Sequence, residues 1–525
     1  MNDTDYDAIV IGCGHNGLVA AYYLAAAGFR VLGFERGSKV GGAATTEEIF
    51  PGYQFATCAH SFSVMHPKII DDLGLLDLGL EISPRDPSMF HPFLDGRHLI
   101  LWNDLEKTQE SIARISTHDA QALPGYFEFW RRAGALFEPY LLTEPPTHAE
   151  FMQRVAGTSE EEIAYALITG SRRALLDEHF ESPEVKAALG TTFDTGSTDG
   201  AGGLLYFAFA QAIGSQLSAR GLSGHPRGGM GAVMEAMRRA AENAGAEIET
   251  SSPVKRVLIR DGQAFGVEKE DGTEITARAV MSSADPRLTF LGLVGADNLP
   301  GEFVDAVRNL RAAAGYMKLM CAVDGLPDWT ALPGAEQQPH HFAHARICES
   351  LEDIDRAWID ARAGRVPSAC VLGVVTHTLY DDEMAPSGRH AISIWAEYAP
   401  IRPVGASWGE VRDRVSRDLI AQVGKYAPTF PEIVQQSRLH SPSDIEAQAG
   451  ITDGSMHHID MTVDQMLARR PVAGWSDYRT PVKSLYLCGS GCHPGGGVAS
   501  ESQASIASAP IRAMTASSVW FSSGP

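Results

Sequence analysis

The chain contains few positive charges for its size. Among 525 residues there are 43 Lys and Arg but 65 Asp and Glu, which gives a formal net charge of −22. Binding to nucleic acid depends on clustered Lys and Arg, so this balance argues against a nucleic-acid partner. It also argues against a purely electrostatic attachment to anionic membranes. An acidic surface of this kind is typical of a soluble protein.

The sequence also lacks any uninterrupted apolar run long enough to span a bilayer. Its first apolar segment begins within a few residues of Met1, with no basic stretch and cleavage site before it, so no secretion signal is predicted. We therefore expect a cytoplasmic protein, with membrane contact limited at most to a peripheral surface patch. No pattern in the sequence specifies an oligomeric state.

Cysteine and metal motifs are equally scarce. The seven cysteines are odd in number, scattered and without a CxxC pair, which fits a reducing compartment and argues against disulfide redox chemistry. The clusters His340-His341-x-x-His344 and His457-His458 lack a completing set of Cys, Asp or Glu ligands, and HExxH is absent. We predict no metal site and place these histidines in loops or at a pocket rim.

Residues 6–36 are the most informative stretch of the chain. An apolar run over residues 8–11 has the composition of a buried parallel strand. The pattern GxGxxG follows at residues 12–17, and a helical pattern then continues to a stop near Gly28. A second apolar strand is predicted at residues 31–34. This order predicts the first half of a doubly wound α/β domain.

Each glycine of the motif has a physical role. Gly12 lets the chain turn sharply out of the strand, and Gly14 lets the backbone approach a pyrophosphate. Gly17 allows the helix to pack close to the sheet. Free N–H groups and the helix dipole at His15 and Asn16 favour the negative charge of a diphosphate. The spacing therefore predicts a dinucleotide site.

Glu35 ends the second strand about 20 residues after the glycines, where a carboxylate accepts a hydrogen bond from a ribose hydroxyl. The same carboxylate would repel a 2′-phosphate, which argues against NADP. The alternative is a glycine-rich turn in some other α/β unit. That alternative explains the glycines alone but not the ordered set of strand, glycines, helix, strand and acid.

A second small-residue segment follows at Gly41, Gly42, Ala43 and Ala44. It removes bulky side chains directly after the nucleotide strand, so a flat ligand could lie against the backbone. The alternative is an ordinary glycine loop.

Changes in residue pattern divide the chain into two interleaved domains. The nucleotide-binding domain is predicted to comprise residues 1–80, 220–298 and 476–525. Residues 81–219, rich in helical patterns and aromatic clusters, and residues 299–475, which contain strand-like runs, are predicted to form an inserted substrate or cap domain. The length is compatible with about two to four domains.

The C-terminal region repeats the order of strand, glycine-rich loop and helix that is predicted for the first motif. A strand beginning at Leu485 enters a loop that contains Gly489 and Gly497, followed by Val498. A helical stretch is predicted from about Ala499, whose N-terminus would offer N–H donors and a positive dipole end. The loop is therefore a second candidate contact for the same ligand.

Together these segments resemble the phytoene desaturase-like FAD oxidoreductases of the amine oxidase and carotenoid desaturase superfamily. The resemblance covers VIGCGHNGLVAAYYLAAAG, KVGGAA, RGGMGAVMEAM, VMSSADP and GWSDYRTPVKSLYLCGSGCHPGGGV. SPSDIE and GSMHH place it nearest the branch called pyridine nucleotide-disulphide oxidoreductase domain-containing protein. Cys13, His15 and Cys492 depart from the residues expected at their positions, and the missing CxxC argues against the disulfide reductase activity that the branch name suggests.

The resemblance implies a Rossmann-type, discontinuous FAD-binding domain with an inserted α+β substrate domain. It implies that FAD is held by Gly12, Gly14, His15, Asn16, Gly17, Glu35, Arg36, Gly41, Gly42, Ala43, Ala44, Val254, Gly489, Gly497 and Val498.

The predicted activity is movement of a hydride between a substrate C–H bond and flavin N5, without metal. The helix start near residue 499, aimed at the flavin N1/O2 edge, would stabilise the charge that develops there. Family likeness and the aromatic inserted segments favour an apolar or lipid-like substrate that is desaturated. No catalytic residue is identified, and His60, Tyr206 and His493 are the candidates for the pocket.

Two alternatives remain open at this point. A flavin amine oxidase of the same fold would need an aromatic cage and an acidic anchor, and the sequence shows neither. A lipid-carrying escort protein without catalysis would have lost flavin, against which the intact Glu35 and the complete GGGV tail argue.

Overall fold

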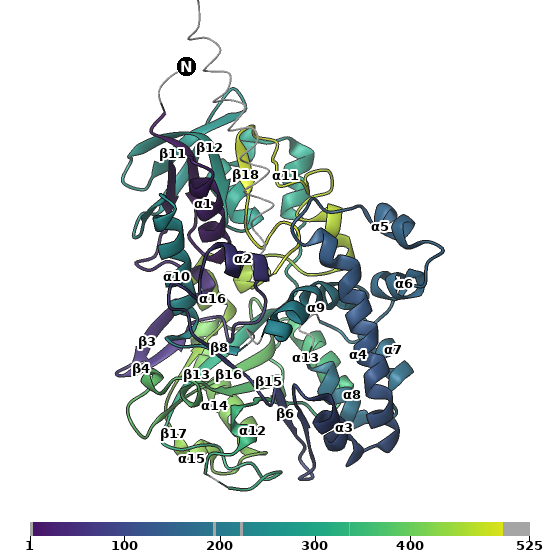
Figure 1. Ribbon diagram of the computed structural model, residues 1–525. Helices are drawn as coiled ribbons and strands as arrows, with labels where there is room; N and C mark the ends of the chain where they lie inside the picture. The colour runs from purple at the N-terminus through teal and green to yellow at the C-terminus, as the bar shows by residue number, and fades with distance from the viewer. Residues whose placement is uncertain (1–3, 193–195, 221–223, 335, 497–525) are drawn as a thin grey trace, which may run out of the picture.

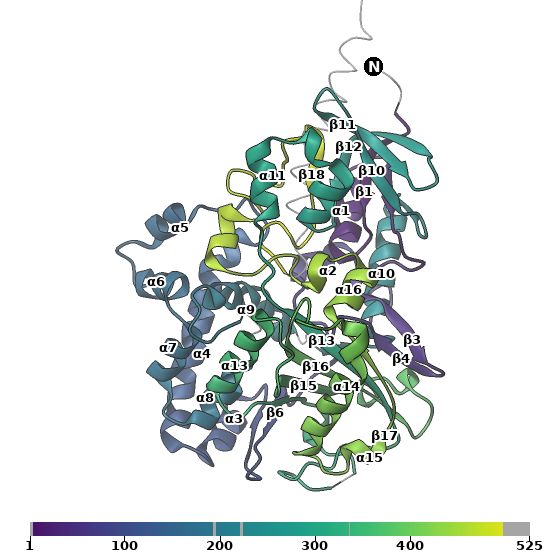
Figure 2. The same cartoon turned by 180° about the vertical axis from the view of Figure 1, so that it is seen from behind.

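A computed structural model describes residues 4–192, 196–220, 224–334 and 336–496 of the chain (Figure 1; Figure 2 shows the opposite side). Within these residues, two sheets of seven strands each form the framework of the protein. Both sheets are covered by helices. The predicted mixed α/β fold is therefore confirmed.

The first sheet lies in the upper half of Figure 1. Its strands within the described chain are β1 (Tyr6–Ile11), β2 (Val31–Phe34), β9 (Glu247–Glu249), β10 (Val254–Arg260), β11 (Gln263–Lys269), β12 (Glu274–Ser282) and β18 (Leu485–Leu487). They lie in the order β10-β11-β12-β1-β2-β9, and β18 also pairs with β12. The β9, β2, β1, β12 and β18 strands pair in parallel. Consequently, the carboxyl ends of β1, β2, β12 and β18 meet at one edge.

Both faces of this sheet are buried, as the continuous apolar strands predict. Ala8 and Val10 pack against α1 (His15–Ala26) and α10 (Gly229–Asn243). Ile9 and Ile11 point to the opposite face, toward a short π-helix, η3 (Leu288–Val294), and α11 (Gly301–Arg308). Both faces of β1 are therefore packed against helices.

The second sheet lies below the first in Figure 1. Its strands within the described chain are β6 (Met89–Pro92), β7 (His98–Leu101), β13 (Gly315–Val323), β14 (His344–Ile347), β15 (Val371–Thr376), β16 (His390–Ala399) and β17 (Val434–His440). They lie in the order β17-β13-β16-β15-β14-β6-β7. All pairs are antiparallel except β14 with β6.

Strand β13, which lies between β17 and β16, shows how this sheet is oriented. Met317 and Leu319 pack into a core that includes α14 (Trp408–Gly424). Because side chains alternate along a strand, Tyr316 and Lys318 point to the other face. There, Lys318 donates to the carbonyl oxygens of Ala56 and Ala59, at and beyond the end of β4 (Tyr53–Ala56). That face of the second sheet is therefore directed toward residues 53–59 in the N-terminal part of the chain.

A group of helices covers the side of the second sheet that is at the right of Figure 1. They are α3 (Leu105–Ala113), α4 (Thr117–Phe137), α5 (His148–Val155), α6 (Glu161–Thr169), α7 (Arg172–His179), α8 (Pro183–Gly190) and α9 (Gly203–Arg220). Their interior is apolar and rich in aromatic rings, as the sequence predicted for this stretch.

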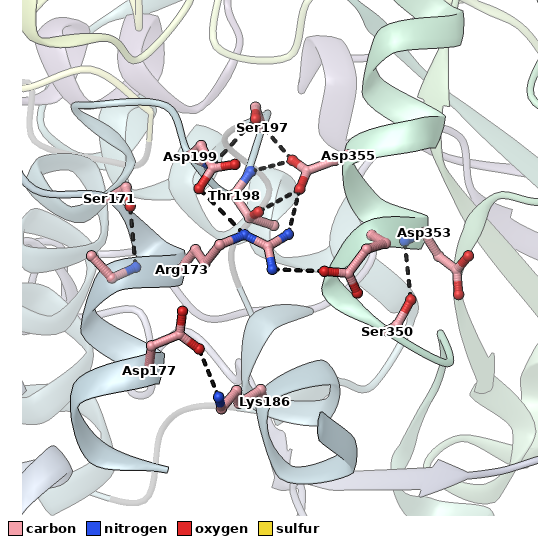
Figure 3. Close-up of polar contacts among 12 residues, drawn as sticks. Ser171, Arg173, Asp177, Lys186, Ser197, Thr198, Asp199, Ser350, Asp353 and Asp355 are labelled. Atoms are coloured by element: carbon pink, nitrogen blue, oxygen red, sulfur yellow. Dashed lines mark hydrogen bonds and ion pairs between the residues drawn. The ribbon is translucent and has the colours of Figure 1, made fainter. Parts of the chain in front are cut away.

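A polar network joins this helical group to α13 (Leu351–Arg362), beside the second sheet (Figure 3). Arg173 forms ion pairs with Asp199, Glu352 and Asp355 at 3.3, 2.8 and 2.7 Å. Asp355 also accepts hydrogen bonds from the backbone N–H and the hydroxyl of Thr198, at 2.7 and 2.6 Å. The network thus attaches the loop before α9 to α13.

The remaining described strands and helices are β3 (Thr46–Phe50), β4, β5 (Ile82–Pro84), β8 (Gly224–Pro226), α2 (Pro67–Asp72), α12 (Pro339–Phe342), α15 (Phe430–Ile433) and α16 (Pro442–Ala449). The helix expected from about residue 499 lies outside the described residues.

Each seven-stranded sheet draws its strands from one of the two predicted groups of ranges. The first uses residues 6–34, 247–282 and 485–487, and the second uses 89–101 and 315–440. The domain boundaries themselves stay a prediction. Across the described residues, no helix combines the length and the apolar composition that a membrane crossing requires.

Candidate functional site

The carboxyl ends of the parallel strands in the first sheet surround a cavity of about 300 Å³, which we call the strand-end cavity. A crevice at this edge is where open α/β sheets bind their ligands. Its lining includes most of the predicted cofactor residues, namely Gly12, Gly14, His15, Asn16, Glu35, Arg36, Gly41, Gly42, Ala43 and Val254.

Close packing at Gly17 shapes the first glycine loop. Gly17 does not line the strand-end cavity, and a Cβ atom there would overlap the carbonyl oxygen of Gly12. Gly12 itself has a φ of +84°, and it lies against the hydroxyl of Ser283. Glycine at residue 17 therefore lets α1 begin directly behind the turn, so that its first N–H groups reach the cavity.

The second small-residue segment stacks on this loop. The backbone N–H of Gly41 donates to the carbonyl of Cys13 at 2.9 Å, and Gly41 pairs with Gly14 as an isolated parallel bridge. Ala43 lines the cavity, whereas Ala44 lines a neighbouring one described below. The two motifs thus form one continuous wall with little side-chain bulk.

Glu35 is only 7% exposed, although it lines the cavity. Its two carboxylate oxygens accept from the backbone N–H groups of Cys13 and Gly37, at 3.0 and 2.8 Å. Burial raises the pKa of this carboxyl, and the two N–H donors and Arg36 partly oppose the rise. A carboxylate accepts more than two hydrogen bonds, so Glu35 retains capacity for a ligand hydroxyl.

Arg36 has a role that its sequence position did not reveal. Its guanidinium donates to the carbonyl oxygens of Ala447 and Gln448, both at 2.7 Å. These carbonyls belong to the last turn of α16, where helix carbonyls lack partners within the helix. Arg36 therefore attaches the C-terminal end of α16 to the rim of the strand-end cavity.

The C-terminal loop closes the cavity from the other end of the chain. A Cβ atom at Gly489 would overlap the carbonyl of Ser283, so this glycine permits close contact between the loops after β18 and β12. Ser490 lines the cavity, and its hydroxyl accepts from the Asn16 amide at 3.2 Å. Gly497 and Val498 lie outside the described residues.

A second cavity of about 220 Å³, which we call the apolar cavity, adjoins the first. Both are lined by His15, Ala43, Ile451, Met456 and Ser490. Most other walls of the apolar cavity are hydrophobic, including Phe62, Val64, Met65, Met230, Val233, Met234, Tyr316, Trp395 and Ile445.

The three candidate catalytic residues occupy different places. His60 and Tyr206 line the apolar cavity. His493 is fully buried, lines neither cavity, and donates from Nε2 to the carbonyl of Tyr140 at 2.7 Å. Burial lowers the pKa of His493 to about 4. His60 and Tyr206 are thus the two candidates that border space for a substrate.

The family model described as "Flavin containing amine oxidoreductase" matches residues 17–501. The chain belongs to this family. Accordingly, the protein is an FAD-dependent oxidoreductase, and the predicted relation to the amine oxidase and carotenoid desaturase superfamily is confirmed.

Relatives span nearly the whole chain. Pyridine nucleotide-disulfide oxidoreductase domain-containing protein 2 of Mus musculus is 35% identical, over 94% of this chain and 91% of the relative. A limonene dehydrogenase component of Castellaniella defragrans is 29% identical, over 93% and 91% of the two chains. Hydroxyneurosporene desaturase of Cereibacter sphaeroides is 25% identical, over 93% and 94%.

A solved structure supports the fold. Putrescine oxidase bound to putrescine is similar with a TM-score of 0.62, and the similarity covers 97% of this chain and 99% of that one. Its sequence is 16% identical, so the likeness concerns the arrangement of the chain alone. Together with the parallel strands described above, it confirms the Rossmann-type architecture.

The strand-end cavity fits FAD, the cofactor of this family. A Cβ atom at Gly14 would meet no protein atom closer than 3.9 Å, so its absence leaves free space at the cavity wall. The first turn of α1 offers N–H groups for a diphosphate, and Glu35 offers an acceptor for a ribose. We propose that the lining residues Gly12, Gly14, His15, Asn16, Glu35, Arg36, Gly41, Gly42, Ala43 and Val254 hold FAD, with Gly17 and Gly489 allowing the loops to assemble.

Sequence reasoning missed Arg470, which is 0% exposed. Its guanidinium donates to the carbonyls of Ser490 and His457 at 2.7 and 2.6 Å, and it has no carboxylate partner among the hydrogen bonds of the described residues. Burial lowers the pKa of Arg470 to about 10. Arg470 supports the loop that closes both cavities, and the segment RRPVAGW has no pattern that indicates this role.

Asp285, in the segment VMSSADP, was not predicted to bind a ligand, yet it lines the strand-end cavity. It accepts from the backbone N–H groups of Arg287 and Leu288 at 2.9 and 3.1 Å. Its other oxygen accepts from the N–H and hydroxyl of Thr452, at 3.0 and 2.7 Å. Asp285 therefore joins the loop after β12 to the segment that follows α16.

Proposed function

We propose that this FAD-dependent oxidoreductase desaturates an apolar, lipid-like substrate bound in the apolar cavity. The observation that supports the proposal best is the composition of the cavity wall. Among the described residues, no Asp, Glu, Lys or Arg lines it, and methionine, valine and aromatic side chains dominate. Burial of apolar surface is the main attraction that such a wall offers.

The same wall argues against a protonated amine as substrate. An ammonium group that leaves water requires a carboxylate or the open face of an aromatic ring. Tyr316 and Trp395 are stacked on each other, with ring centroids 5.1 Å apart and an interplanar angle of 27°. This pair leaves no space for an amine between its rings, so it is not the aromatic cage that an amine oxidase would need.

The names of two relatives agree with desaturation of an apolar substrate rather than oxidation of an amine. One is a limonene dehydrogenase component and the other a hydroxyneurosporene desaturase, and both names denote dehydrogenation rather than amine oxidation. Putrescine oxidase, by contrast, shares the fold at 16% identity. The proposal therefore follows the relatives of higher sequence identity.

The residues of this chain would contribute orientation and the exclusion of water. The two cavities share Ala43 and Ser490, so a substrate in one can approach a ligand in the other. Bound FAD would accept a hydride from one substrate C–H bond, while the adjacent C–H bond would release its proton to a base and leave its electron pair to form the C=C bond. Apolar walls such as Met230 and Met234 would orient the substrate chain and exclude water from it, which are the main requirements of direct hydride transfer.

The test is anaerobic bleaching of the flavin absorbance in the purified holoenzyme. We expect bleaching by neutral terpenoids and long-chain lipids but not by a panel of primary and secondary amines. Bleaching by amines, with hydrogen peroxide released on readmission of air, would show an amine oxidase instead. Colourless protein that takes up no FAD but binds lipid would show a carrier.

A further inference from the structure

Residues 450–458, which follow α16, form part of the wall of the strand-end cavity. Two of them that are not glycine have positive φ, namely Asp453 at 61° and His458 at 65°. Residues other than glycine adopt this left-handed region seldom, and such backbone is concentrated at ligand sites, where the surroundings fix it. Of the two, His458 lines the strand-end cavity and Asp453 does not. His458 is therefore the residue of this segment whose placement points to a ligand.

The backbone around His458 is held by three hydrogen bonds. Its own N–H donates to the carbonyl of Ser455 at 2.8 Å. The buried guanidinium of Arg470 donates to the carbonyls of His457 and Ile459, at 2.6 and 3.4 Å, and these residues flank His458 on either side. The contacts hold the left-handed conformation and thereby fix where the side chain of His458 leaves the backbone at the cavity wall.

His458 is half-buried, and its ring nitrogens have no hydrogen-bond partner among the described residues. Nδ1 is fully enclosed, and a Cβ atom on Gly491 would lie 3.5 Å from it. Nε2 is therefore the nitrogen that a ligand in the strand-end cavity can reach. Burial lowers the pKa of His458 to about 4, so the ring is neutral near pH 7 and keeps one N–H donor.

The charged groups around this ring are engaged elsewhere. Asp285 and Arg470 are the charged residues that act on His458 most strongly. Asp285 already accepts from two backbone N–H groups and from Thr452, as described above. Every hydrogen bond that Arg470 makes within the described residues goes to a backbone carbonyl. The ring thus lacks a partner within the described part of the protein, which is unfavourable for a buried polar group.

The order of the strands places His458 at one end of the strand-end cavity. The carboxyl ends follow the order β2, β1, β12 and β18 across the sheet. Glu35, the acceptor for a ribose, follows β2, and Gly14 follows β1. His458 lies at the other end, against Gly491 in the loop after β18, and Ser490 of that loop is shared with the apolar cavity. A dinucleotide that begins at Glu35 and crosses the glycine loop would therefore meet His458 beyond its adenosine half.

We propose that Nε2 of His458 donates a hydrogen bond to an oxygen of the diphosphate–ribityl portion of FAD. The inference rests on the placement of FAD in the strand-end cavity that is proposed above. A diphosphate oxygen would accept a charge-assisted hydrogen bond, and a ribityl hydroxyl a neutral one. Because His458 lies between the glycine loop and Ser490, this bond would fix how far the flavin end extends toward the apolar cavity. His458 is in that sense a positioning residue for the cofactor.

The test is titration of the apoprotein, prepared from the holoenzyme, with FAD, ADP and AMP. His458→Asn suits it because Asn adopts the left-handed region readily and its amide ends short of the imidazole Nε2. We expect this variant to bind FAD at least about tenfold more weakly, as for one lost hydrogen bond to a charged group, and AMP within about twofold of the parent. Weaker ADP binding would identify a diphosphate oxygen, and unchanged ADP binding a ribityl hydroxyl. His118→Asn, at an exposed histidine of α4, should retain all three affinities.

An unchanged FAD affinity in His458→Asn would overturn the proposal. A weaker affinity for AMP or a lower melting temperature of the apoprotein would also overturn it, because either would show a structural role. Gly14→Ala separates the placement of FAD from the role of His458. If neither variant weakens FAD binding, the placement of FAD in the strand-end cavity is refuted; if Gly14→Ala alone weakens it, only the role of His458 is refuted. Failure of the desaturation test would leave the His458 result standing, since affinity is measured without a substrate.

Discussion

Substitution by alanine should affect stability differently at two glycines of one motif. At Gly17 a Cβ atom would overlap the carbonyl oxygen of Gly12, and it would also lie 3.1 Å from the Ser283 hydroxyl. At Gly14 the nearest protein atom would be 3.9 Å away, and φ and ψ of −71° and 178° are open to alanine. Gly17→Ala should therefore disturb the fold itself, whereas Gly14→Ala should disturb only what enters the cavity.

The expected magnitudes follow from this geometry. Overpacking of a rigid interior costs about 1–3 kcal/mol, and the Gly12 carbonyl, as backbone, has little freedom to move away. Gly17→Ala apoprotein should accordingly lose about that much stability. Gly14→Ala apoprotein should be within about 0.5 kcal/mol of the parent, as for other substitutions without a clash. Both variants should bind FAD at least about tenfold more weakly, since backbone approach to the diphosphate is blocked or displaced.

Thermal unfolding of the two apoproteins and titration with FAD, followed by quenching of flavin fluorescence, would measure these effects. The reasoning is refuted if Gly14→Ala destabilises the apoprotein as much as Gly17→Ala does. It is equally refuted if Gly17→Ala binds FAD with the affinity of the parent protein.

Three further predictions concern residues outside the glycine loop. The stability of Lys318→Met minus that of the parent protein should be more favourable at pH 6 than at pH 10. Burial lowers the pKa of Lys318 to about 7. The destabilisation caused by its buried charge is therefore fully present below pH 7 and disappears as the pH rises toward 10.5. Melting curves across that range test this, and a pH-independent difference contradicts it. Arg470→Met should lower the free energy of unfolding by roughly 3–5 kcal/mol and reduce the FAD content, because buried carbonyls including that of Ser490 lose their donor. A normal FAD content in this variant would show that Arg470 does not support the cofactor site. Asp355→Ala should speed amide exchange at Thr198, which donates to Asp355, while Asp353→Ala on the same helix should not; equal exchange in both variants would contradict the attachment in Figure 3.

Local patterns predicted the nucleotide-binding half well. The strand, glycine loop, helix and second strand appear at β1, α1 and β2 with the expected order. Their signals are strong because a strand buried on both faces must be continuously apolar, and a helix that begins at a tight turn requires small residues. This order together with Glu35 predicted a dinucleotide site, and the resemblance to FAD oxidoreductases specified FAD as the dinucleotide.

The contacts of Arg36 and Arg470 could not be predicted in the same way. Arg36 meets carbonyls at residues 447 and 448, and Arg470 meets the carbonyl of residue 490. An arginine in a polar segment has the same local pattern whether it is exposed or buried. Only packing of distant segments decides which carbonyls it reaches.

The amino-acid sequence by itself determined the fold class and the small-residue walls of the dinucleotide site, because both depend on short-range constraints of backbone and side-chain size. Tertiary structure alone decided which of the candidate residues border the apolar cavity. His60 lines the cavity, whereas His493 is enclosed against Tyr140. That difference arises from contacts between residues hundreds of positions apart, whose register no local periodicity encodes.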